Sequence, residues 1–487
     1  MRTKIVCTIG PASESEEMLR ALMRAGMDVA RLNMSHGNHE DHGRRLELVR
    51  KVAAEEHQLV AVMADLQGPK FRVGDLPVEG LQLLKGALIV LFDPGREKPT
   101  FGPDVQLVPM PHPELIAAMR SGNRVLIDDG VLELRVVENP TATGSVRCAV
   151  VAGGQLLARK GVSVPGAKVA VSSLTPKDKI DLKWAVAHGV DAVALSFVRA
   201  ADDIRELRAL INVQCEDASK SPYIVAKIEK PEALKDFDNI LKVTDIVMVA
   251  RGDLGVETSA QEVPFYQKKI IRECVRAGVP VITATQMLQS MIHSPSPTRA
   301  EASDVANAVL DGTDAIMLSA ESASGEYPLE SVQTMQSIAT RAEAEGRSGV
   351  AATTDWHMVC KQSMSGDDIA TAMAVAAVEI AEDVGAKAIV CLTHSGSTAR
   401  MVARLRPVVP IIALSPNART CMLTAFMSSV QAIHMQHVTE VQAMFDISIK
   451  SLRDNGYVSE GDRVVIVAGV PIGRGAGTTN LVKVQVV

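Results

Sequence analysis

Short apolar runs alternate with amphipathic helical patterns along most of this chain, and this alternation limits the fold more than any other feature. Three runs of strand type precede a long interruption and five follow it: residues 3–8, 28–33, 60–65, 192–196, 223–227, 246–250, 279–284 and 315–319. Strands that alternate with helices indicate βα units and a parallel sheet. Eight such units predict a (β/α)₈ TIM barrel. An open doubly wound sheet is the competing fold, although no GxGxxG motif follows any of the eight runs.

Several helix starts can be read from local patterns. Ser13 and Glu16 form an S-x-x-E capping pattern, and Gly26 supplies a helix stop. Thr175 followed by Pro176 predicts the start of a helix in the second half of the barrel.

The interruption has a different pattern, and it predicts an inserted domain. Between Gly68 and Gly166, strand-like runs follow one another with short turns, and Asp129-Gly130 is typical of a hairpin. We expect residues 70–166 to form a small antiparallel β-barrel that acts as a lid. It divides the TIM barrel into residues 1–69 and 167–343. A C-terminal α/β domain with a largely parallel sheet is predicted for residues 344–487, from the apolar runs 388–392, 411–414 and 464–467.

Composition excludes several classes of partner. The net charge of −6 offers no basic field for nucleic acid, and aromatic residues, at 3%, offer few stacking platforms. The N-terminus lacks an apolar signal core, and no apolar run of about 18 residues predicts a membrane span. The seven scattered cysteines include no CxxC pair. We therefore expect reduced thiols and a cytoplasmic location.

Charged side chains of opposite sign stand where two of the predicted strands end. Lys227 and Glu229 are two positions apart, so they share one face of their strand. The next strand closes on Arg251, Gly252 and Asp253. Two carboxylates suit Mg²⁺, which prefers oxygen ligands and completes its shell with water or substrate oxygens. A lysine beside that ion suits a phosphorylated ligand. A structural salt bridge from Glu229 to Lys227 or Arg251 is the simpler alternative.

The other predicted barrel strands also end on polar residues. Because working residues of βα barrels lie at the carboxyl ends of the strands, we expect these residues to meet at one rim. They are Arg31, Asn33, Ser35, Asp65, Ser196, Thr283, Thr285, Gln286, Ser319 and Glu321.

Several long motifs resemble those of the pyruvate kinase family, and especially of its bacterial branch. They are residues 7–13 (CTIGPAS), 31–37 (RLNMSHG), 65–70 (DLQGPK), 227–229 (KIE), 250–257 (ARGDLGVE), 284–288 (ATQML), 297–301 (PTRAE) and 304–312 (DVANAVLDG). The resemblance covers the whole chain in order. It implies an enzyme of glycolysis that transfers the phosphoryl group of phosphoenolpyruvate to ADP.

The resemblance also implies roles for residues at the rim. Glu229 and Asp253 would hold Mg²⁺, for which Mn²⁺ can substitute, and Lys227 would neutralise the phosphoryl group in transfer. The backbone at Gly252 and Asp253 would receive the substrate carboxylate, and Thr285 would assist protonation of the enolate, through water. Further contacts are expected from Ser196 to the substrate, from Arg31 to the phosphates of both substrates, and from Arg72, Lys160 and Asp128 to the nucleotide.

A monovalent-cation site is implied as well. In the family this site uses the positions of Asn33, Ser35, Asp65 and the backbone of Leu66. Members that need K⁺ usually carry Glu where this chain has Lys70. A lysine ammonium at this position would supply the charge that K⁺ otherwise brings, so we expect an enzyme that does not require K⁺.

The C-terminal domain resembles the regulatory domain of the family. Thr393, Ser395, Gly396, Ser397 and Thr398 form a loop before a helix, where the family binds phosphorylated allosteric effectors. Many members have a basic residue at the position of Ser397, so the effector stays open, and a plain helix cap is the alternative. The glycine-rich segment 473–477 is expected to complete the pocket. The resemblance further implies a homotetramer.

Two other functions remain as alternatives. One is a barrel enzyme that binds pyruvate-like enolates on Mg²⁺, such as a class II aldolase or lyase, but this leaves the inserted lid unexplained. The other is a catalytically silent sensor of sugar phosphates. The presence of Lys227, Glu229, Asp253 and Thr285 argues against that alternative.

Overall fold

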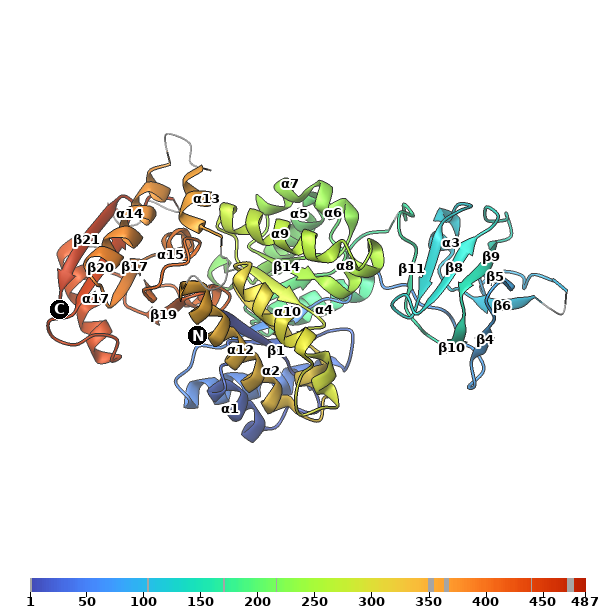
Figure 1. Ribbon diagram of the computed structural model, residues 1–487, viewed down its shortest axis with the longest axis horizontal. Helices are drawn as coiled ribbons and strands as arrows, with labels where there is room; N and C mark the ends of the chain where they lie inside the picture. The colour runs from blue at the N-terminus through green and yellow to red at the C-terminus, as the bar shows by residue number, and fades with distance from the viewer. Residues whose placement is uncertain are drawn as a thin grey trace.

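Three units lie in a row along the long axis of the molecule. The computed structural model describes residues 2–102, 105–169, 171–215, 217–348, 354–362, 368–438, 440–470 and 477–487. The barrel stands in the middle, with the C-terminal domain on one side and the inserted lid on the other (Figure 1). The N-terminus lies on the side of the barrel that faces the C-terminal domain. The domain boundaries predicted from the sequence stay predictions.

Eight parallel strands close the central barrel, as the sequence predicted. Neighbours follow the order β1, β2, β3, β12, β13, β14, β15 and β16, and β16 pairs back to β1. The strands are β1 Lys4–Thr8, β2 Val29–Asn33, β3 Ala61–Asp65, β12 Ala192–Leu195, β13 Tyr223–Ile228, β14 Ile246–Ala250, β15 Val281–Ala284 and β16 Ala315–Leu318. The lid is inserted between β3 and β12, which are neighbours in the barrel. It therefore leaves and re-enters the barrel at adjacent strands.

Alternate residues along the barrel strands belong to two different buried sets. Alternate residues, such as Val29, Met63 and Val225, belong to one apolar cluster, whereas their neighbours Ala30, Val62 and Ala226 pack with the surrounding helices in another. Because side chains alternate across a strand, the first set fills the barrel interior. Lys227 continues that inward parity, so its polar head emerges where the barrel interior opens at the rim.

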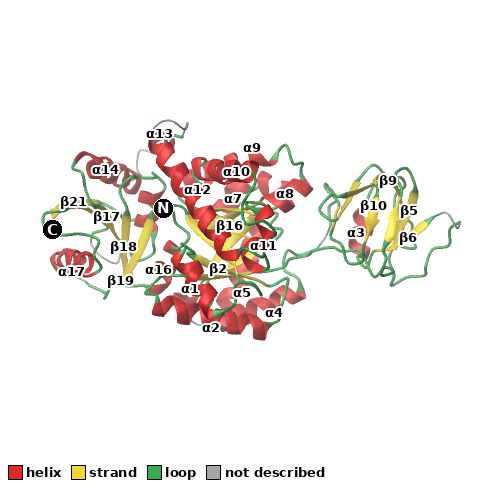
Figure 2. Cartoon of the chain, turned by 60° about the horizontal axis from the view of Figure 1, so that its bottom comes forward, coloured by secondary structure: helices red, strands yellow, loops and turns green. Residues whose placement is uncertain are grey.

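Helices surround the barrel (Figure 2). They are α1 Glu16–Arg24, α2 His39–Glu55, α4 Pro176–Ala187, α5 Ala201–Gln214, α6 Pro231–Lys235, α7 Phe237–Leu241, α8 Arg251–Glu257, α9 Val263–Ala277, α10 Arg299–Leu310, α11 Ala320–Ala323 and α12 Pro328–Ser348. Capping boxes on Thr175 and Thr298 start α4 and α10, because each hydroxyl accepts a hydrogen bond from the third helical residue. Two 3₁₀ turns cover Ala218–Lys220 and Gln289–Ile292.

Strands joined by loops form the lid, with the short helix α3 among them (Figure 2). One sheet has the order β11-β7-β8-β9-β5-β6, and a separate pair joins β10 to β4. The predicted antiparallel pairing holds for each pair except β5 with β6, which is parallel. The elements are β4 Leu81–Leu83, β5 Leu88–Phe92, β6 Gln106–Pro109, α3 Pro113–Ala118, β7 Arg124–Ile127, β8 Leu132–Val136, β9 Ser145–Ala152, β10 Gly154–Leu156 and β11 Val162–Ser163.

The C-terminal domain is a five-stranded sheet with helices on both faces. The order is β19-β18-β17-β20-β21, and only the pair β20–β21 is antiparallel among the described strands. Helices α14 and α17 pack on opposite faces (Figure 2). The elements are α13 Trp356–Gln362, α14 Ile369–Asp383, β17 Ala388–Leu392, α15 Ser397–Ala403, β18 Ile411–Ser415, α16 Ala418–Thr424, β19 Val430–His434, α17 Val441–Asp454, β20 Arg463–Ala468 and β21 Leu481–Val486.

A buried ion pair joins the C-terminal domain to the barrel. Both guanidinium Nη atoms of Arg406 bind the carboxylate of Asp314, at 2.9 and 3.0 Å. The same carboxylate accepts the backbone N–H groups of Val281 and Ser428, so it connects the start of β15 to the C-terminal domain. Bidentate pairs of this kind fix orientation as well as distance.

Candidate active site

Arg31 and Asp65 form a buried pair at the ends of β2 and β3. Nε and Nη2 of Arg31 lie 2.8 and 2.7 Å from Asp65 Oδ2, and Nη1 donates to Thr8 Oγ1 at 2.8 Å. Burial raises the pKa of Asp65, but the charges of Lys227 and Arg31 outweigh it, so its pKa lies below the ordinary value. Asp65 is therefore a fixed anion between two cations.

Lys227 connects the ends of three neighbouring strands, β3, β12 and β13. Its ammonium donates to Ser196 Oγ at 2.7 Å and lies 3.0 Å from Glu229 Oε1 and 3.2 Å from Asp65 Oδ1. Burial alone would lower the pKa of this ammonium, but the Asp65 and Glu229 carboxylates raise it above its usual value. The lysine is therefore a buried, permanently charged group.

The carboxylate of Glu229 is placed to bind a cation. Its Oε2 accepts the backbone N–H of Phe197 at 2.7 Å, whereas the buried Oε1 accepts no hydrogen bond of good geometry from the described residues and faces only the ammonium of Lys227. Burial raises the pKa of Glu229 to about 7; the charge of Lys227 opposes that rise and the charge of Asp253 adds to it. Such a carboxylate gains from a second cation.

Asp253 supplies the second carboxylate, from the first turn of α8. Its side chain forms no hydrogen bond or ion pair with the described residues, and it lines the cleft between barrel and lid. Within the part of the chain that the structure covers, no group of three or more His, Cys, Asp or Glu side chains is placed to hold a metal ion. Two hard oxygen donors with an unsatisfied buried Oε1 fit Mg²⁺, which takes its other ligands from water and substrate.

Thr285 follows the end of β15, and it lies beside α8. Its Oγ1 accepts the backbone N–H of Gly252 at 2.8 Å. That N–H is one that the sequence assigned to the substrate carboxylate, so a substrate at this position would meet an amide that is already hydrogen-bonded. Thr283, which the sequence also placed at the rim, packs away from it and donates to Thr313 Oγ1. Ser319 and Glu321 line the cleft with Thr285.

The residues of the predicted monovalent-cation site lie at the ends of β2 and β3. Asn33 Oδ1 accepts the backbone N–H of Ser35 at 3.2 Å. The carbonyl of Leu66 accepts from Ser196 Oγ at 2.7 Å. Lys70 lines the cleft with Asp253, and its ammonium has no hydrogen bond or ion pair to the described residues. Protein cations therefore already contact Asp65, the charged member of the predicted site.

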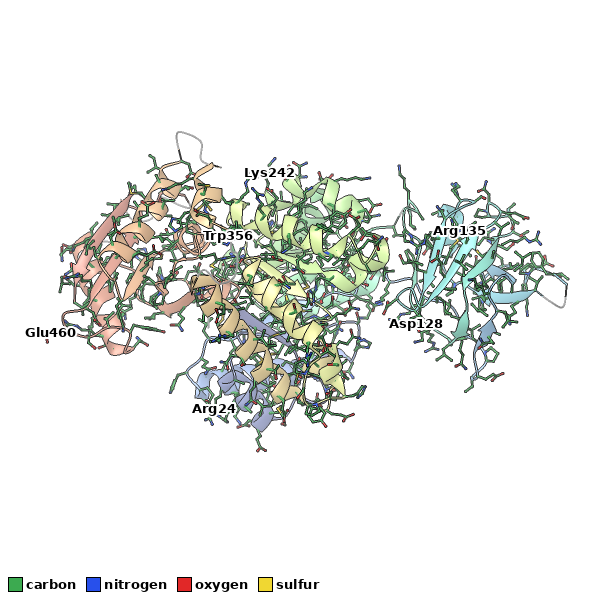
Figure 3. The ribbon with its side chains drawn as sticks, in the orientation of Figure 1. Arg24, Asp128, Arg135, Lys242, Trp356 and Glu460 are labelled. Carbon is green, nitrogen blue, oxygen red and sulfur yellow. The ribbon has the colours of Figure 1, made fainter. Side chains whose placement is uncertain are left out.

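The predicted nucleotide residues lie across the cleft, on the lid. Lys160 Nζ lies 2.9 Å from Asp128 Oδ1, and both side chains are about one-third exposed. Arg72 forms an isolated bridge to Gly161, and its guanidinium donates to the carbonyl of Arg159. Asp128 lies at the edge of the lid nearest the barrel (Figure 3). Among the described residues, these three side chains form no contact with Lys227, Asp65 or Glu229, which together with Arg31 and Asp253 are called the Lys227 cluster.

Comparisons with known proteins identify the family of this chain. A family model described as "Pyruvate kinase, barrel domain" matches residues 1–332, and one described as "Pyruvate kinase, alpha/beta domain" matches residues 371–485. The chain belongs to the pyruvate kinase family. It is 43% identical to a pyruvate kinase of Geobacillus stearothermophilus, over 100% of this chain and 80% of that protein. A Synechocystis protein named pyruvate kinase 2 is 44% identical, over 100% and 79%.

A solved structure agrees with the fold. The crystal structure of a pyruvate kinase from Cryptosporidium parvum superposes with a TM-score of 0.90 at 33% identity, over 100% of this chain and 96% of that one. This pyruvate kinase family member is accordingly an enzyme of the phosphotransferase class. No described helix has the length and apolar character that a membrane span requires.

The predicted effector loop of this pyruvate kinase family member lines a pocket in the C-terminal domain. Thr393 Oγ1 accepts the N–H of Gly396 at 2.9 Å, and Thr398 Oγ1 lies 2.9 Å from Thr479 Oγ1. The pocket is lined by Leu392, Thr393, His394, Ser395, Ser397, Thr398, Leu414, Pro416, Met435, Gln436, His437, Val438, Met444, Ala468, Gly469 and Thr478. None of these is Lys, Arg, Asp or Glu. Residues 473–476 of the predicted glycine-rich wall lie outside the described residues.

Some residues of the site were not found by sequence reasoning. Thr8 is the last residue of β1 and lies two positions after Val6, so both side chains are on the face of the strand that points into the barrel. The alternation of the strand could therefore have revealed Thr8 as a rim residue. Glu257 accepts hydrogen bonds from Ser163 Oγ of strand β11 in the lid and from Lys230 Nζ, each at 2.5 Å, and so joins the lid to the rim. The backbone N–H of Phe197 could not have been found, because its contact with Glu229 depends on a left-handed backbone (φ +55°).

Proposed function

We propose that this enzyme transfers the phosphoryl group of phosphoenolpyruvate to ADP, giving pyruvate and ATP, at the carboxyl rim of the barrel. The main support is the Lys227 cluster at the rim, in which two largely buried cations (Arg31 and Lys227) and two carboxylates (Asp65 and Glu229) are in contact and the charge of Asp253, which lines the cleft, acts on Glu229. Phosphoryl transfer depends mainly on positioning and on charge neutralisation, and this cluster supplies both.

Each residue of the cluster has a distinct part in this proposal. Glu229 and Asp253 would hold Mg²⁺ or Mn²⁺, which supplies charge neutralisation on the substrate's oxygens. Lys227 would contact the phosphoryl group, because its ammonium stays charged beside Asp65. Arg31 would bind the phosphates, and Ser196 would orient the lysine through their 2.7 Å hydrogen bond. Thr285 would assist protonation of the enolate.

The nucleotide would bind from the lid side of the cleft. Arg72 and Lys160 offer positive charge there, and Asp128 would meet the metal ion of the nucleotide. The Lys160–Asp128 pair is partly exposed, so both side chains are accessible to a ligand. The aldolase-type alternative would leave these three lid residues without a use.

We further propose that turnover does not require K⁺. Arg31 and Lys227 already contact the two oxygens of Asp65, and Lys70 adds an ammonium without a carboxylate partner in the described chain. A third fixed cation near the cleft would reduce the gain from binding K⁺.

Regulation by a phosphorylated metabolite in the C-terminal pocket, assembly into a homotetramer and a cytoplasmic location complete the proposal. The hydroxyls of Thr393, Ser395, Ser397 and Thr398 can donate to phosphate oxygens, and the loop between them turns at Gly396, whose φ is +83°. The seven cysteines are all free, as a reducing compartment favours.

A coupled assay tests the catalytic proposal directly. Purified enzyme is mixed with phosphoenolpyruvate, ADP and Mg²⁺, and pyruvate and ATP are measured separately. Stoichiometric formation of both products is expected. Formation of neither would favour a silent sensor, and cleavage of a carbon–carbon bond in an aldol substrate would favour the aldolase alternative.

A further inference from the structure

Two successive residues after β15 have a left-handed backbone. The φ angles of Thr285 and Gln286 are +67° and +54°. A β-branched residue rarely adopts this conformation, because its side chain then crowds the backbone. Strained backbone of this kind persists only where surrounding contacts hold it, and it is common at functional sites.

One buried guanidinium binds the carbonyl oxygens of this turn. Arg251, 7% exposed, begins α8 immediately after β14. Its Nε donates to the carbonyl of Ala284 at 3.3 Å, and its Nη2 donates to those of Thr285 at 2.7 Å and Gln286 at 3.3 Å. Three successive carbonyls thus converge on a single planar group, and this is the geometry that opposes relaxation of the turn.

The far side of the guanidinium is anchored to two helices. Arg251 Nη1 lies 2.7 Å from the carboxylate of Asp304 on α10 and 3.3 Å from Gln267 Oε1 on α9. Gln267 is itself held by a hydrogen bond to Asp311 at 3.1 Å. Because both ends of the fork are occupied, the plane of the guanidinium cannot rotate without losing contacts on one side.

The next residue along the chain orients the hydroxyl of Thr285. The N–H of Gly252 donates to Thr285 Oγ1, so this oxygen is the acceptor in that bond and its own hydrogen is directed elsewhere. No other hydrogen bond engages Oγ1 within the described residues, and Thr285 lines the cleft. The hydroxyl hydrogen is therefore available to a group or water in the cleft.

We propose that Arg251 is a positioning residue for proton transfer to the enolate, acting through the backbone of Thr285. The inference rests on the proposed function. In that step the C=C π pair of the enolate forms the carbon–hydrogen bond at C3, while an O–H bond of the donor, a water held by the Thr285 hydroxyl, breaks and leaves hydroxide. The electron pair of the enolate oxygen becomes the carbonyl bond of pyruvate. Arg251 touches neither substrate nor proton, but it fixes where the hydroxyl stands.

The variant Arg251→Lys tests this role. Lysine keeps the charge, and so the attraction to Asp304, but its ammonium cannot serve three carbonyls in the plane of a fork. The readout is exchange of the methyl protons of pyruvate with D₂O, followed by ¹H NMR in the presence of Mg²⁺ and ATP. We expect a loss of exchange by a factor of about 10 to 100, with the KM for phosphoenolpyruvate changed less than about threefold.

A double-mutant cycle separates positioning from general support of the fold. If Arg251 acts through Thr285, R251K causes no further loss of exchange in a Thr285→Ala background. The matched control is Arg208→Lys, because Arg208 also binds a carbonyl and a carboxylate, those of Val243 and Asp245, but before the opposite end of β14. Exchange by R208K should equal that of the parent enzyme.

Other outcomes would overturn the inference. These are wild-type exchange by R251K, an equal loss in the T285A background, or an equal loss of exchange and of phosphoenolpyruvate binding. If R251K does not fold, Gln267→Leu removes one anchor of the same fork, and a selective loss of exchange of about threefold is expected instead. Unchanged exchange in that variant would also refute the role. If the parent enzyme makes no pyruvate and ATP, the proposed function fails and this inference fails with it; parental activity with normal R251K exchange defeats only the inference.

Discussion

The barrel rim and the C-terminal pocket are both predicted to receive phosphate groups, yet their side chains differ in charge. The rim buries Arg31, Lys227, Asp65 and Glu229 in mutual contact. The described lining of the pocket has hydroxyls, two histidines and apolar side chains, and no Lys, Arg, Asp or Glu. Buried charges are costly unless they pair, so a protein keeps them where chemistry needs a strong field. Reversible binding needs only hydrogen-bond donors.

The largest effect on turnover is predicted for a substitution of Lys227, in the charged rim. The variant Lys227→Met removes the ammonium that faces Ser196, Glu229 and Asp65 and leaves no substitute cation at that point. Turnover of phosphoenolpyruvate should fall by about 10³-fold. Circular dichroism and a melting curve should show a folded protein, since the methionine stem fills the same space.

The matched control for that variant is Lys242→Met, because Lys242 is exposed on the outside of the barrel (Figure 3). Its activity should equal that of the parent enzyme. Activity of K227M within a factor of about ten of the parent would show that the rim does not depend on a fixed charge, and the contrast with the pocket would then be lost.

The next effect is a pH dependence of metal binding. Burial raises the pKa of Glu229 to about 7. A proton therefore competes with the cation for this carboxylate, and Mn²⁺ binding should tighten by about tenfold between pH 6 and pH 8. Between about pH 4.5 and pH 7, Glu229 keeps its proton in the folded state but has lost it in the unfolded state. The free energy of unfolding should therefore fall as the pH rises through this range.

Titration of Mn²⁺ followed by electron paramagnetic resonance, without substrate, measures this pH dependence. Glu229→Gln should bind Mn²⁺ more weakly and lose most of the dependence. Asp245→Asn is a change of the same type. Asp245 directly precedes β14, at the end of the barrel opposite the rim, so this variant should keep the pH dependence of Mn²⁺ binding. Equal affinity of the parent enzyme at pH 6 and pH 8 would mean that Glu229 is not a ligand.

The sequence was sufficient for the strands that are buried on both faces. The predicted range of β14 coincides with the observed one, and the other barrel strands differ by no more than two residues at either end. Strands at the edge of a sheet were less visible: β21 was missed, because none of its residues is buried and its exposed side chains, Val484 and Val486, are apolar. The start of α1 was misplaced. Ser15 caps it, whereas Ser13 accepts the N–H of Gly10 in the preceding turn.

The site shows the same division. Lys227 and Glu229 could be placed on one face from their spacing alone, since a strand alternates its side chains. The fork of Arg251 and the N–H of Phe197 could not be predicted. Both depend on loops that meet only after the barrel closes, and on left-handed backbone that no local pattern reveals.

A third prediction concerns the positive charge of Lys70. Replacing Na⁺ or tetramethylammonium by K⁺ should change turnover less than about twofold. Lys70→Glu should create a site for a monovalent cation, so K⁺ should then raise turnover by about tenfold. Lys85→Glu, at an exposed position of the lid, is the control and should stay insensitive to K⁺. Strong activation of the parent enzyme by K⁺ would contradict the proposal, because it would show that the lysine and arginine side chains at the rim do not replace K⁺.

The smallest expected effect lies in the pocket, where binding shifts an equilibrium and takes no part in the chemistry. We expect at least one of AMP, glucose 6-phosphate, ribose 5-phosphate or fructose 1,6-bisphosphate to lower the half-saturating concentration of phosphoenolpyruvate, by about fivefold. Ser395→Asp should abolish that shift, because a carboxylate would repel phosphate at a loop whose described residues offer no cation to offset it. Gln431→Glu adds the same charge to an exposed position of the domain, outside the pocket lining, and should respond as the parent does. A full response by S395D would place the effector elsewhere. Of the two sites, only the rim would then remain as a predicted phosphate site. The loop at residues 393–398 would be the start of a helix without a ligand.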